Sequence, residues 1–340
     1  MENSTNPKFI MQYVVEEETL SSFLRKMRFQ SGSGQGEMCL LELYPGIQVW
    51  TIDFYMEQLD IQPMGAYHYL KMNYCLRGSC EVPLPDERYV YIGQGTLSVD
   101  SNPPAGIMQL PTGEYVGLEI VMDMDVLRGG GPPAWAECGV QILAMTQSLL
   151  DRQGSYLASA SREWAELAQE IYQHIQANDL PLEDYRFHIL HLFWMLKGKS
   201  QKQLAQFRTY LTLGQREVVL QAKKLMTCDL RQRYTITEVA ARVGISAASL
   251  KKYFGVMFGM PISTYLRRLR ISTAKELLAG GTRSIADVAS DVGYENQGKF
   301  GAVFRQETGI TPLEYRRRCR NHINEREERD YENTVGSEKR

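Results

Sequence analysis

The sequence predicts an α+β protein in which a β-rich N-terminal domain precedes an all-helical C-terminal domain. In the first 135 residues, short β-branched and aromatic segments alternate with turn residues, and helical periodicity takes over after the Gly- and Pro-rich turn at 129–133. Beyond residue 215, one helical pattern occurs twice. A length of 340 residues suits two or three domains of roughly 100 to 200 residues each. We expect domains at 1–135, 136–214 and 215–320, and a disordered tail at 321–340.

The N-terminal segment contains five stretches with the composition of β-strands. They are rich in β-branched and aromatic residues, often in alternation, and turn pairs such as Pro45-Gly46 and Thr112-Gly113 lie between them. Short strands at this spacing favour a β-barrel or a β-sandwich. The expected strands are Cys39–Tyr44, Gln48–Met56, Tyr67–Leu76, Tyr89–Val99 and Tyr115–Met122.

Residues 136–214 contain two runs with apolar residues at helical spacing. One extends from Trp164 to Ile175, and the other from Phe187 to Leu196. Such wide apolar faces either pack on the β-domain or form the seam of a dimer, and the pattern alone leaves both open. We interpret the region as a dimerisation and linker segment, which predicts a homodimer.

Charge is distributed unevenly along the chain. Residues 1–214 hold 15 Lys and Arg against 25 Asp and Glu, a net charge of −10. Residues 215–320 hold 19 against 9, a net charge of +10, and the last twenty residues carry −2. A block of about a hundred residues with this excess attracts polyanions. The near-zero total of −2 therefore conceals a basic C-terminal domain.

Composition excludes several classes of protein. The chain is 44% hydrophobic and 23% charged, which is ordinary for a globular protein and unlike a disordered or collagenous one. Its six cysteines include no C-x-x-C pair, so we expect reduced thiols. The sequence shows neither an apolar run of membrane-spanning length nor a signal-peptide pattern at its start, and we therefore expect a cytoplasmic protein with no membrane partner.

Residues 235–265 and 284–315 are two copies of one pattern at a shift of 49 to 50 residues. Each copy combines a first helix with a small central residue, a Gly that ends it, a polar cap and a second helix with two apolar residues at i and i+4. This is the pattern of a helix-turn-helix motif, and a linker helix at 261–278 joins the copies. The matched residues are Ile236 and Ile285, Ala240 and Ala289, Gly244 and Gly293, Leu250 and Phe300, Phe254 and Phe304, Gly259 and Gly309.

The second helix of each copy leaves a polar face that suits the major groove of duplex DNA. Small residues at its start allow close approach, Asn and Gln can pair with adenine, and Lys or Arg can pair with guanine or phosphate. In the first copy the candidate DNA-binding residues are Ser246, Ala247, Ala248, Ser249, Lys251 and Lys252. In the second they are Asn296, Gln297, Gly298, Lys299 and Arg305, with Glu295, Ala302 and Gln306 on the same face. The linker arginines Arg267, Arg268 and Arg270 are either phosphate contacts or a solvated helix face.

At these residues the sequence resembles the AraC/XylS family of transcription regulators. The resemblance covers roughly 215–318, with ITEVAARVGISAASLKKYFGVMFGMPISTYL as the first motif and linker and SIADVASDVGYENQGKFGAVFRQETGITPLEYRR as the family's signature region. It implies a regulator that sets two recognition helices in successive major grooves, most often as an activator that recruits RNA polymerase. The chain departs from the family pattern at Lys252, Gly298, Gly301 and Ala302, and the two glycines each lower helix propensity by roughly 1 kcal/mol.

Upstream, the β-rich segment followed by helices resembles the cupin-type sensing domain of such regulators. The run MNYCLRGSCEVPL…GTLSVD…PTGEYVGLEIVMD is similar to regulators of the pyochelin-receptor type, which implies a small-molecule effector and, within that type, a siderophore. Aromatic and polar side chains of the segment suit a pocket for a planar or polar effector. The candidate effector-binding residues are Trp50, Tyr55, Tyr67, His68, Tyr69, Tyr74, Arg77 and Tyr115.

The residues argue against an enzyme. Cupin metal sites need several His and a carboxylate, whereas the β-segment contains a single histidine, His68, so we expect no metal and no cofactor. The sequence thus predicts a sequence-specific, effector-responsive transcription regulator with double-stranded DNA as its partner. Three alternatives stay open: a cupin-type metalloenzyme fused to a DNA-binding module, a repressor that needs no effector, and a nonspecific architectural protein.

Overall fold

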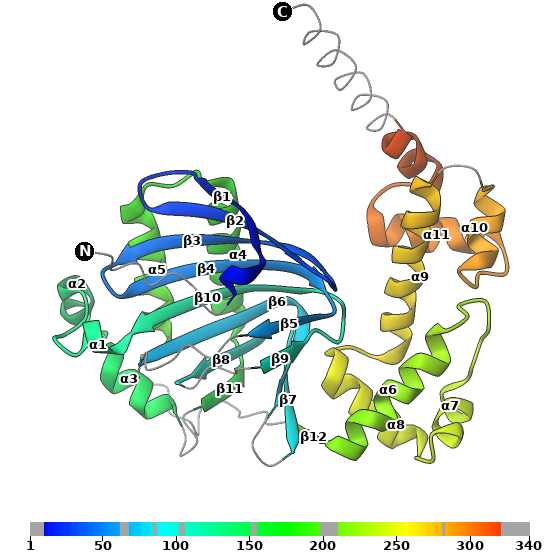
Figure 1. Ribbon diagram of the computed structural model, residues 1–340, viewed down its shortest axis with the longest axis horizontal. Helices are drawn as coiled ribbons and strands as arrows, with labels where there is room; N and C mark the ends of the chain where they lie inside the picture. Colours follow the sequence, from blue (N-terminus) through cyan, green and yellow to red (C-terminus); the bar gives the residue numbers. More distant parts are fainter. Residues whose placement is uncertain are drawn as a thin grey trace, which may run out of the picture. The chain divides into compact units, whose positions relative to one another are not determined.

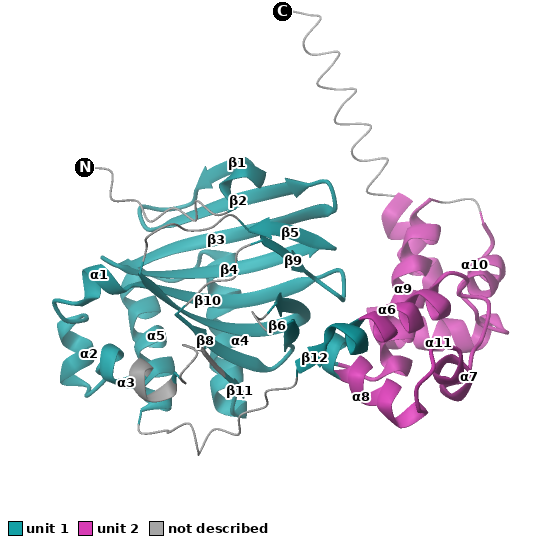
Figure 2. Ribbon diagram, turned by 60° about the horizontal axis from the view of Figure 1, so that its bottom comes forward, with its two compact units in different colours: residues 1–216, 256–259 teal, residues 217–255, 260–340 magenta. Residues whose placement is uncertain are grey.

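The structure is a computed structural model that describes residues 10–61, 68–83, 87–101, 106–150, 155–197, 210–280 and 283–320. It divides into an N-terminal unit, residues 1–216 with 256–259, and a C-terminal unit, residues 217–255 and 260–340 (Figure 2). The first unit is built on an antiparallel β-sheet and the second is helical (Figure 1). The expected tail at 321–340 lies outside the described residues, as does Tyr67.

The sheet of the N-terminal unit explains how distant segments come together. Its strands are β1 Val14–Thr19, β2 Leu24–Ser31, β3 Gly34–Tyr44, β4 Ile47–Met56, β5 Gln58–Ile61, β6 Tyr69–Pro83, β7 Arg88–Gly93, β8 Thr96–Asp100, β9 Gly106–Gln109, β10 Tyr115–Asp123, β11 Ser155–Ser159 and β12 Tyr210–Thr212. The main path runs β1-β2-β3-β4-β10-β6-β7-β12. Strands β8 and β9 also pair with β6, and they in turn pair with β11 and β5.

The expected strand segments all overlap observed strands. The segment 89–99 forms two strands, β7 and β8, because the chain turns between them at Gly95, whose φ of +83° favours glycine. Long β6 reaches from β10 and β8 at one end to β7 and β9 at the other. Its position makes β6 the strand that connects the two ends of the sheet.

Alternation along the strands gives the sheet two buried faces. On β4, Ile47 and Val49 belong to one core, whereas Trp50 and Ile52 belong to the other. Successive side chains point to opposite sides of a strand, so a strand with both faces covered is apolar along most of its length. The first face is covered by helices, and the second surrounds a cavity that is described below.

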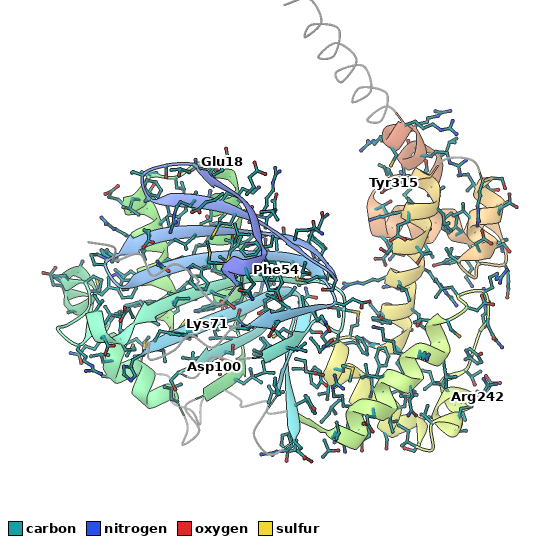
Figure 3. All side chains as sticks on the ribbon, in the orientation of Figure 1. Glu18, Phe54, Lys71, Asp100, Arg242 and Tyr315 are labelled. Carbon is teal, nitrogen blue, oxygen red and sulfur yellow. The ribbon has the colours of Figure 1, made fainter. Side chains whose placement is uncertain are left out.

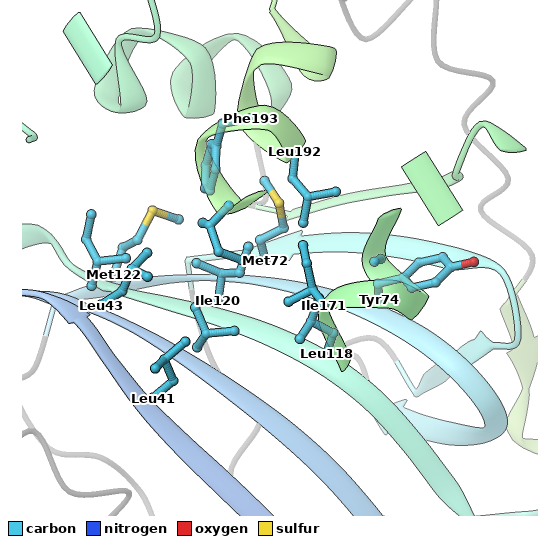
Figure 4. Packing of buried hydrophobic residues seen from close by; sticks show 14 of the residues in the cluster. Leu41, Leu43, Met72, Tyr74, Leu118, Ile120, Met122, Ile171, Leu192 and Phe193 are labelled. Carbon is cyan, nitrogen blue, oxygen red and sulfur yellow. The ribbon is translucent and has the colours of Figure 1, made fainter. Parts of the chain in front are cut away.

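Helices α4 Arg162–Ala177 and α5 Leu182–Leu196 cover the first face (Figure 4). Ile171 from α4 and Leu192 and Phe193 from α5 pack with strand residues such as Leu118 and Met72. The wide apolar faces that sequence analysis identified are therefore used, in large part, for packing on the sheet. Short helices precede them: α1 Met124–Leu127, α2 Pro133–Glu137 and α3 Ile142–Leu149, with a 3₁₀ turn η1 at Met11–Tyr13.

The C-terminal helices follow one another with short connections (Figure 1). They are α6 Leu213–Thr227, which begins in the N-terminal unit, α7 Ile236–Arg242, α8 Ala247–Phe258, α9 Ile262–Ala279, α10 Ile285–Asp291 and α11 Gln297–Thr308. Residues 312–320 are also helical. A core of Leu278, Val288, Phe300, Phe304 and their neighbours joins α9, α10 and α11. Tyr315, which Figure 3 labels, packs against that core.

Candidate nucleic-acid interface and ligand cavity

The first helix pair, α7 and α8, is defined by its capping residues. Thr235 caps α7 in a capping box with Glu238, and the hydrogen bonds that Glu238 accepts from the Thr235 backbone and hydroxyl lower the pKa of its carboxyl. Gly244 then turns the chain at a φ of +75°, which a side chain would strain. The hydroxyl of Ser246 accepts a hydrogen bond from the Ser249 amide at 3.0 Å and so starts α8.

The second pair, α10 and α11, repeats this construction. Ser284 and Asp287 form the capping box of α10, and the hydrogen bonds from Ser284 lower the pKa of Asp287. Gly293 turns at a φ of +82°, and the Asn296 side chain accepts a hydrogen bond from the Lys299 amide at 2.7 Å. The two pairs have helices of the same lengths, 7 residues followed by 12. Local sequence signals therefore specify the same unit twice.

Apolar residues orient α8 and α11 within their pairs. Leu250 and Phe254 on α8 are fully buried, as are Phe300 and Phe304 on α11. The ring of Phe254 packs edge-on against Tyr265 of α9, with 5.4 Å between ring centroids. Because these residues lie at i and i+4, they place one side of each helix in the core and leave the opposite side to solvent.

The structure leaves every predicted DNA-binding side chain at least partly accessible. On the first pair, Ser246, Ala248, Lys251 and Lys252 are exposed, and Ala247 and Ser249 are half-buried. On the second, the exposed residues are Asn296, Gln297, Gly298, Lys299 and Arg305, together with Glu295, Ala302 and Gln306. The two faces are therefore available at the surface of the C-terminal unit.

Ion pairing distinguishes the cations of these faces from others in the unit. Within the described residues, Lys251, Lys252, Lys299 and Arg305 have no carboxylate within 4.0 Å. By contrast, other arginines of the unit are paired: Arg231 with Asp229, Arg233 with Glu295, Arg267 with Glu307 and Arg283 with Asp291. Cations without an internal counter-ion are the ones that phosphate can neutralise at least cost.

The linker arginines are divided between two roles. Arg267 of α9 pairs with Glu307 of α11 at 2.8 Å, so it holds two helices together. Arg270 is half-buried and donates to the Leu230 carbonyl at 3.3 Å, and its burial lowers the pKa of its guanidinium. Arg268 is exposed. Two of the three arginines thus have structural contacts, and Arg268 is left as a candidate phosphate contact.

A junction between the two helix pairs was missed by sequence analysis. Arg233, just before α7, donates to the carboxylate of Glu295 at 2.6 Å and to the carbonyl of Gly293 at 2.9 Å. A Cβ at Gly293 would lie 2.1 Å from the Leu230 carbonyl oxygen. The pairs are therefore joined directly at this turn as well as through α9. The signal in the sequence was Gly293 itself, since a turn glycine also permits close backbone approach.

The second face of the sheet surrounds a cavity, which we call the strand cavity. It encloses about 680 Å³ of space, its open mouth included. Most of the lining is apolar and comes from many strands: Ile10, Met38, Trp50, Ile52, Phe54, Leu59, Ile61, Cys80, Val82, Ile92 and Met108. Burial raises the pKa of the Cys80 thiol to about 12, so that side chain is uncharged at neutral pH. A cavity of this kind has the composition of a small-molecule site.

Polar side chains gather on three neighbouring strands of the lining. Lys71 and Asn73 of β6 stand opposite Asp100 and Ser98 of β8, and Glu119 of β10 stands opposite Asn73. The Lys71 ammonium lies 3.1 Å from the Glu119 carboxylate. Burial alone would lower the pKa of Lys71, but the charges of Glu119 and Asp100 outweigh it and raise that pKa. We call Lys71, Asn73, Asp100, Tyr115 and Glu119 the polar patch; Lys71, Asp100 and nearby Phe54 are labelled in Figure 3.

Hydrogen bonds fix the rest of the polar patch. The Tyr115 hydroxyl donates to the Asn73 side-chain oxygen at 2.8 Å, and the Asn73 amide donates to Ser98 at 3.3 Å. Burial raises the pKa of Tyr115, so its phenol stays protonated. Sequence analysis missed Lys71, Asn73, Asp100 and Glu119. A usable signal existed, because a single Glu within the otherwise apolar run of β10 is costly to bury unless it has a partner.

The predicted effector residues are distributed over several parts of the unit. Trp50 and Tyr115 line the strand cavity. Tyr74 faces the helices and packs edge-on against Trp164, with 5.1 Å between ring centroids. Tyr55 and Arg77 lie together on the surface, where Arg77 donates to the Tyr55 hydroxyl at 2.6 Å. His68 is exposed, 3.3 Å from Asp125, and Tyr69 is buried in the second core.

The chain leaves the sheet for the C-terminal helices through a defined connection. Strand β12 pairs with β7, and Arg88 lies over the ring of Tyr210 at 4.2 Å. Arg216, in the first turn of α6, donates to the buried carboxylate of Glu81 on β6 at 2.8 Å. Tyr91 of β7 donates to the same oxygen at 2.6 Å. The hydrogen bond to Glu81 raises the pKa of Arg216.

No group of three or more His, Cys, Asp or Glu side chains in the described ranges is arranged to hold a metal ion. Among the helices that the structure describes, none is both long and apolar enough to cross a membrane.

Comparisons with known proteins match the helical region. Residues 239–318 match a family described as a helix-turn-helix domain. The transcriptional activator RhaR of Yersinia pseudotuberculosis is 47% identical over 70 residues, which are 21% of this chain and 24% of that protein. The chain thus matches about a quarter of the length of these curated relatives.

Two solved structures illustrate the structural likenesses. An AraC-type regulator from Chromobacterium violaceum is 26% identical over 31% of this chain and 95% of that chain, with a TM-score of 0.29. ToxT of Vibrio cholerae is 13% identical over 80% of this chain and 98% of that chain, also with a TM-score of 0.29.

Proposed function

We propose that this chain is an AraC/XylS-family protein and a sequence-specific DNA-binding transcription regulator, which its match to a helix-turn-helix domain at 239–318 supports. One observation carries the proposal. The C-terminal unit presents two helices, α8 and α11, that are capped and oriented in the same way. Among the residues that the structure describes, their exposed cations have no carboxylate within 4.0 Å. Helices of this kind enter successive major grooves when both belong to one rigid unit.

Each face supports a different kind of contact. On α8, the short side chains Ala247 and Ala248 permit close approach to base edges, and Lys251 and Lys252 reach phosphate or guanine. On α11, Gln297 can pair with adenine, and Lys299 and Arg305 extend the cationic surface. The amide ends of both helices add a partial positive charge that favours phosphate.

DNA selection from a random-sequence pool tests this function. We expect the full chain to enrich one bipartite sequence whose halves lie about one helical turn apart. Lys252→Ala and Gln297→Ala should weaken binding to that sequence more than binding to random DNA. Arg162→Ala, at an exposed position of α4 in the N-terminal unit, is the matched control and should change neither. Equal losses on all sequences would limit Lys252 and Gln297 to phosphate contacts, and failure to enrich any sequence would contradict the proposal.

We further propose that the strand cavity holds a small-molecule effector. Glu81 lies on β6 between Cys80 and Val82, both of which line the cavity, and Tyr91 precedes the lining residue Ile92 on β7. A ligand in the cavity therefore contacts one side of β6 and β7. The opposite side of these two strands carries Glu81 and Tyr91, and Glu81 binds Arg216 at the start of α6. A ligand can shift DNA binding only if it favours one arrangement of this connection over another.

The effector could act to activate or to repress. The RhaR relatives are named as transcriptional activators, which supports activation and, with it, RNA polymerase as a partner. Transcription from the selected sequence, measured with purified polymerase, tests this: we expect more transcript with the regulator than without it. A decrease would show a repressor.

A homodimer is proposed through the outer face of α5. After the helix has packed on the sheet, Phe187 and Trp194 remain 66% and 54% exposed, and His191 lies between their rings. Aromatic side chains in this arrangement are typical of interface cores. Sedimentation analysis should show a dimer for the wild type and a monomer for Phe187→Glu, whereas Glu183→Gln on the same helix should leave the dimer intact.

A further inference from the structure

We propose that the strand cavity selects an uncharged, mostly apolar small molecule with one hydrogen-bonding end, and that the Lys71–Glu119 ion pair excludes ligands with a net charge. The inference rests on the proposed effector site and specifies its ligand class. It differs from the siderophore that the sequence resemblance implies, because iron chelators are built from anionic oxygen donors.

The distribution of polar and apolar side chains in the lining supports an apolar ligand with one polar end. The polar patch lies on β6, β8 and β10, whereas the walls from β3, β4, β5 and β9 contribute apolar side chains. Trp50 stands opposite Glu119 in the register of β4 and β10, so it marks the boundary between the two regions. A ligand that fills this cavity must place most of its surface against hydrocarbon and only one end against the patch.

Within the polar patch, Lys71 and Glu119 compensate each other's charge. Lys71 is the only cation among the described lining residues, and its ammonium is 3.1 Å from Glu119. Glu119 is 7% exposed at its side chain and Lys71 is 21% exposed, so little water is available to replace a lost partner. A carboxylate ligand would have to draw Lys71 away and leave Glu119 buried without a counter-charge. A cationic ligand would do the same to Lys71. Either arrangement leaves a buried charge without a partner, which is strongly unfavourable.

An uncharged polar group avoids that cost. The contact with Glu119 uses one of the three N–H groups of Lys71, and an alcohol, amide or ketone can accept from another without breaking the pair. The second carboxylate of the polar patch disfavours anions further, because Asp100 stands opposite Lys71 on β8. Its carboxylate raises the number of negative groups around the ammonium.

A series of probes that differ only in the head group tests the inference. Binding of 1-decanol, decanoate and decylammonium to the full-length protein is measured by calorimetry and by quenching of Trp50 emission, with Trp50→Phe to identify that signal. We expect decanol to bind at least about tenfold more tightly than either ion. Decanoate or decylammonium binding as tightly as decanol would overturn the proposal, as would tighter binding of a catechol–iron(III) complex or no binding by any probe.

Two variants should change the preference of the cavity for uncharged probes if the Lys71–Glu119 ion pair determines that preference. Glu119→Gln leaves the Lys71 ammonium without its nearest carboxylate and should raise decanoate affinity by about tenfold or more, with little change for decanol. Lys71→Met should raise decylammonium affinity instead. Glu37→Gln, which breaks the Lys26–Glu37 pair elsewhere on the sheet, is the matched control and should change none of the three affinities. Unchanged selectivity in both cavity variants, with circular dichroism showing them folded, would also overturn the proposal.

DNA binding measured on the same samples separates this inference from the proposed function. If decanol binds selectively but leaves affinity for the selected DNA sequence unchanged, the ligand class stands and the regulatory role of the cavity fails. If the chain binds a specific DNA sequence but no probe, the regulator assignment stands and the ligand class is wrong.

Discussion

Replacing Glu81 by Gln should destabilise the N-terminal unit by about 2 kcal/mol. The side chain of Glu81 is 6% exposed and that of Arg216 is 21% exposed, and their atoms Oε2 and Nε are 2.8 Å apart. Breaking a buried ion pair by removing one charge costs about 3–5 kcal/mol, because the remaining charge stays buried. Water reaches part of Arg216, and a glutamine oxygen can still accept a hydrogen bond, so we expect the lower value.

A double-mutant cycle isolates the pair from its surroundings. Arg216→Met keeps an apolar stem that can contact Tyr89, over whose ring the guanidinium now lies at 4.9 Å. The cycle formed by Arg216→Met, Glu81→Gln and the double mutant should give an interaction free energy of about 2 kcal/mol between the two side chains. The control is the Arg28–Glu16 pair, which has the same separation of 2.8 Å but side chains 58% and 59% exposed. Its cycle should give about 0–1 kcal/mol.

Urea unfolding followed by tryptophan emission is a suitable assay. All four tryptophans, Trp50, Trp135, Trp164 and Trp194, lie in the N-terminal unit, so the signal reports on the unit that contains the pair. The free energy of unfolding falls by about 1–3 kcal/mol per molar urea, so the loss of about 2 kcal/mol expected for Glu81→Gln corresponds to a decrease of about 1 M in the urea midpoint. An interaction free energy no larger than that of the Arg28–Glu16 control would refute the view that this connection holds the start of α6.

Other predictions concern the C-terminal unit. Gly293→Ala should destabilise this unit by more than about 1 kcal/mol in thermal unfolding, because the φ of Gly293 is +82° and a Cβ there would meet a backbone carbonyl. Gly301→Ala should instead stabilise α11 by about 0.5–1 kcal/mol, because a Cβ at Gly301 would have no atom within 4 Å. Ser284→Ala should lower stability by about 1 kcal/mol, seen as a lower melting temperature by circular dichroism. Because folding lowers the pKa of Asp287, this carboxylate stabilises the folded state above its ordinary pKa of 3.8, and the stabilisation is lost as pH falls through the lowered pKa. An acid titration of Asp287→Asn should therefore show a smaller loss of helix below about pH 4 than the wild type does. Lys251→Ala should reduce the slope of log affinity against log salt by about 1, and an unchanged slope would mean that Lys251 does not touch phosphate.

Local signals explain why the helix pairs were predictable. A capping residue, a turn glycine and two apolar residues at i and i+4 each act within one or two turns of chain, and all of them lie close together in the sequence. Thr235, Gly244 and Ser246 therefore specify the first pair before any distant contact is known. The strands were predictable for the same reason, since alternation and turn residues are local.

The strand cavity depended on information that is not local. Lys71, Asp100 and Glu119 come together only because β6 lies between β8 and β10 in a register that one sequence does not reveal. Residue type alone favoured aromatic side chains such as Tyr74, which the structure places against the helices. The neighbouring Asn73 faces the cavity instead, because successive residues of a strand point to opposite sides.

The two helix pairs of the C-terminal unit are joined at more than one place. The pairs are joined by α9, by the contacts of Arg233 with Glu295 and Gly293, and by the contact of Arg270 with Leu230. These three connections fix the separation of α8 and α11, so a change in that separation would have to break several contacts together. We infer that the proposed effector, if it regulates DNA binding, leaves the spacing of α8 and α11 unchanged.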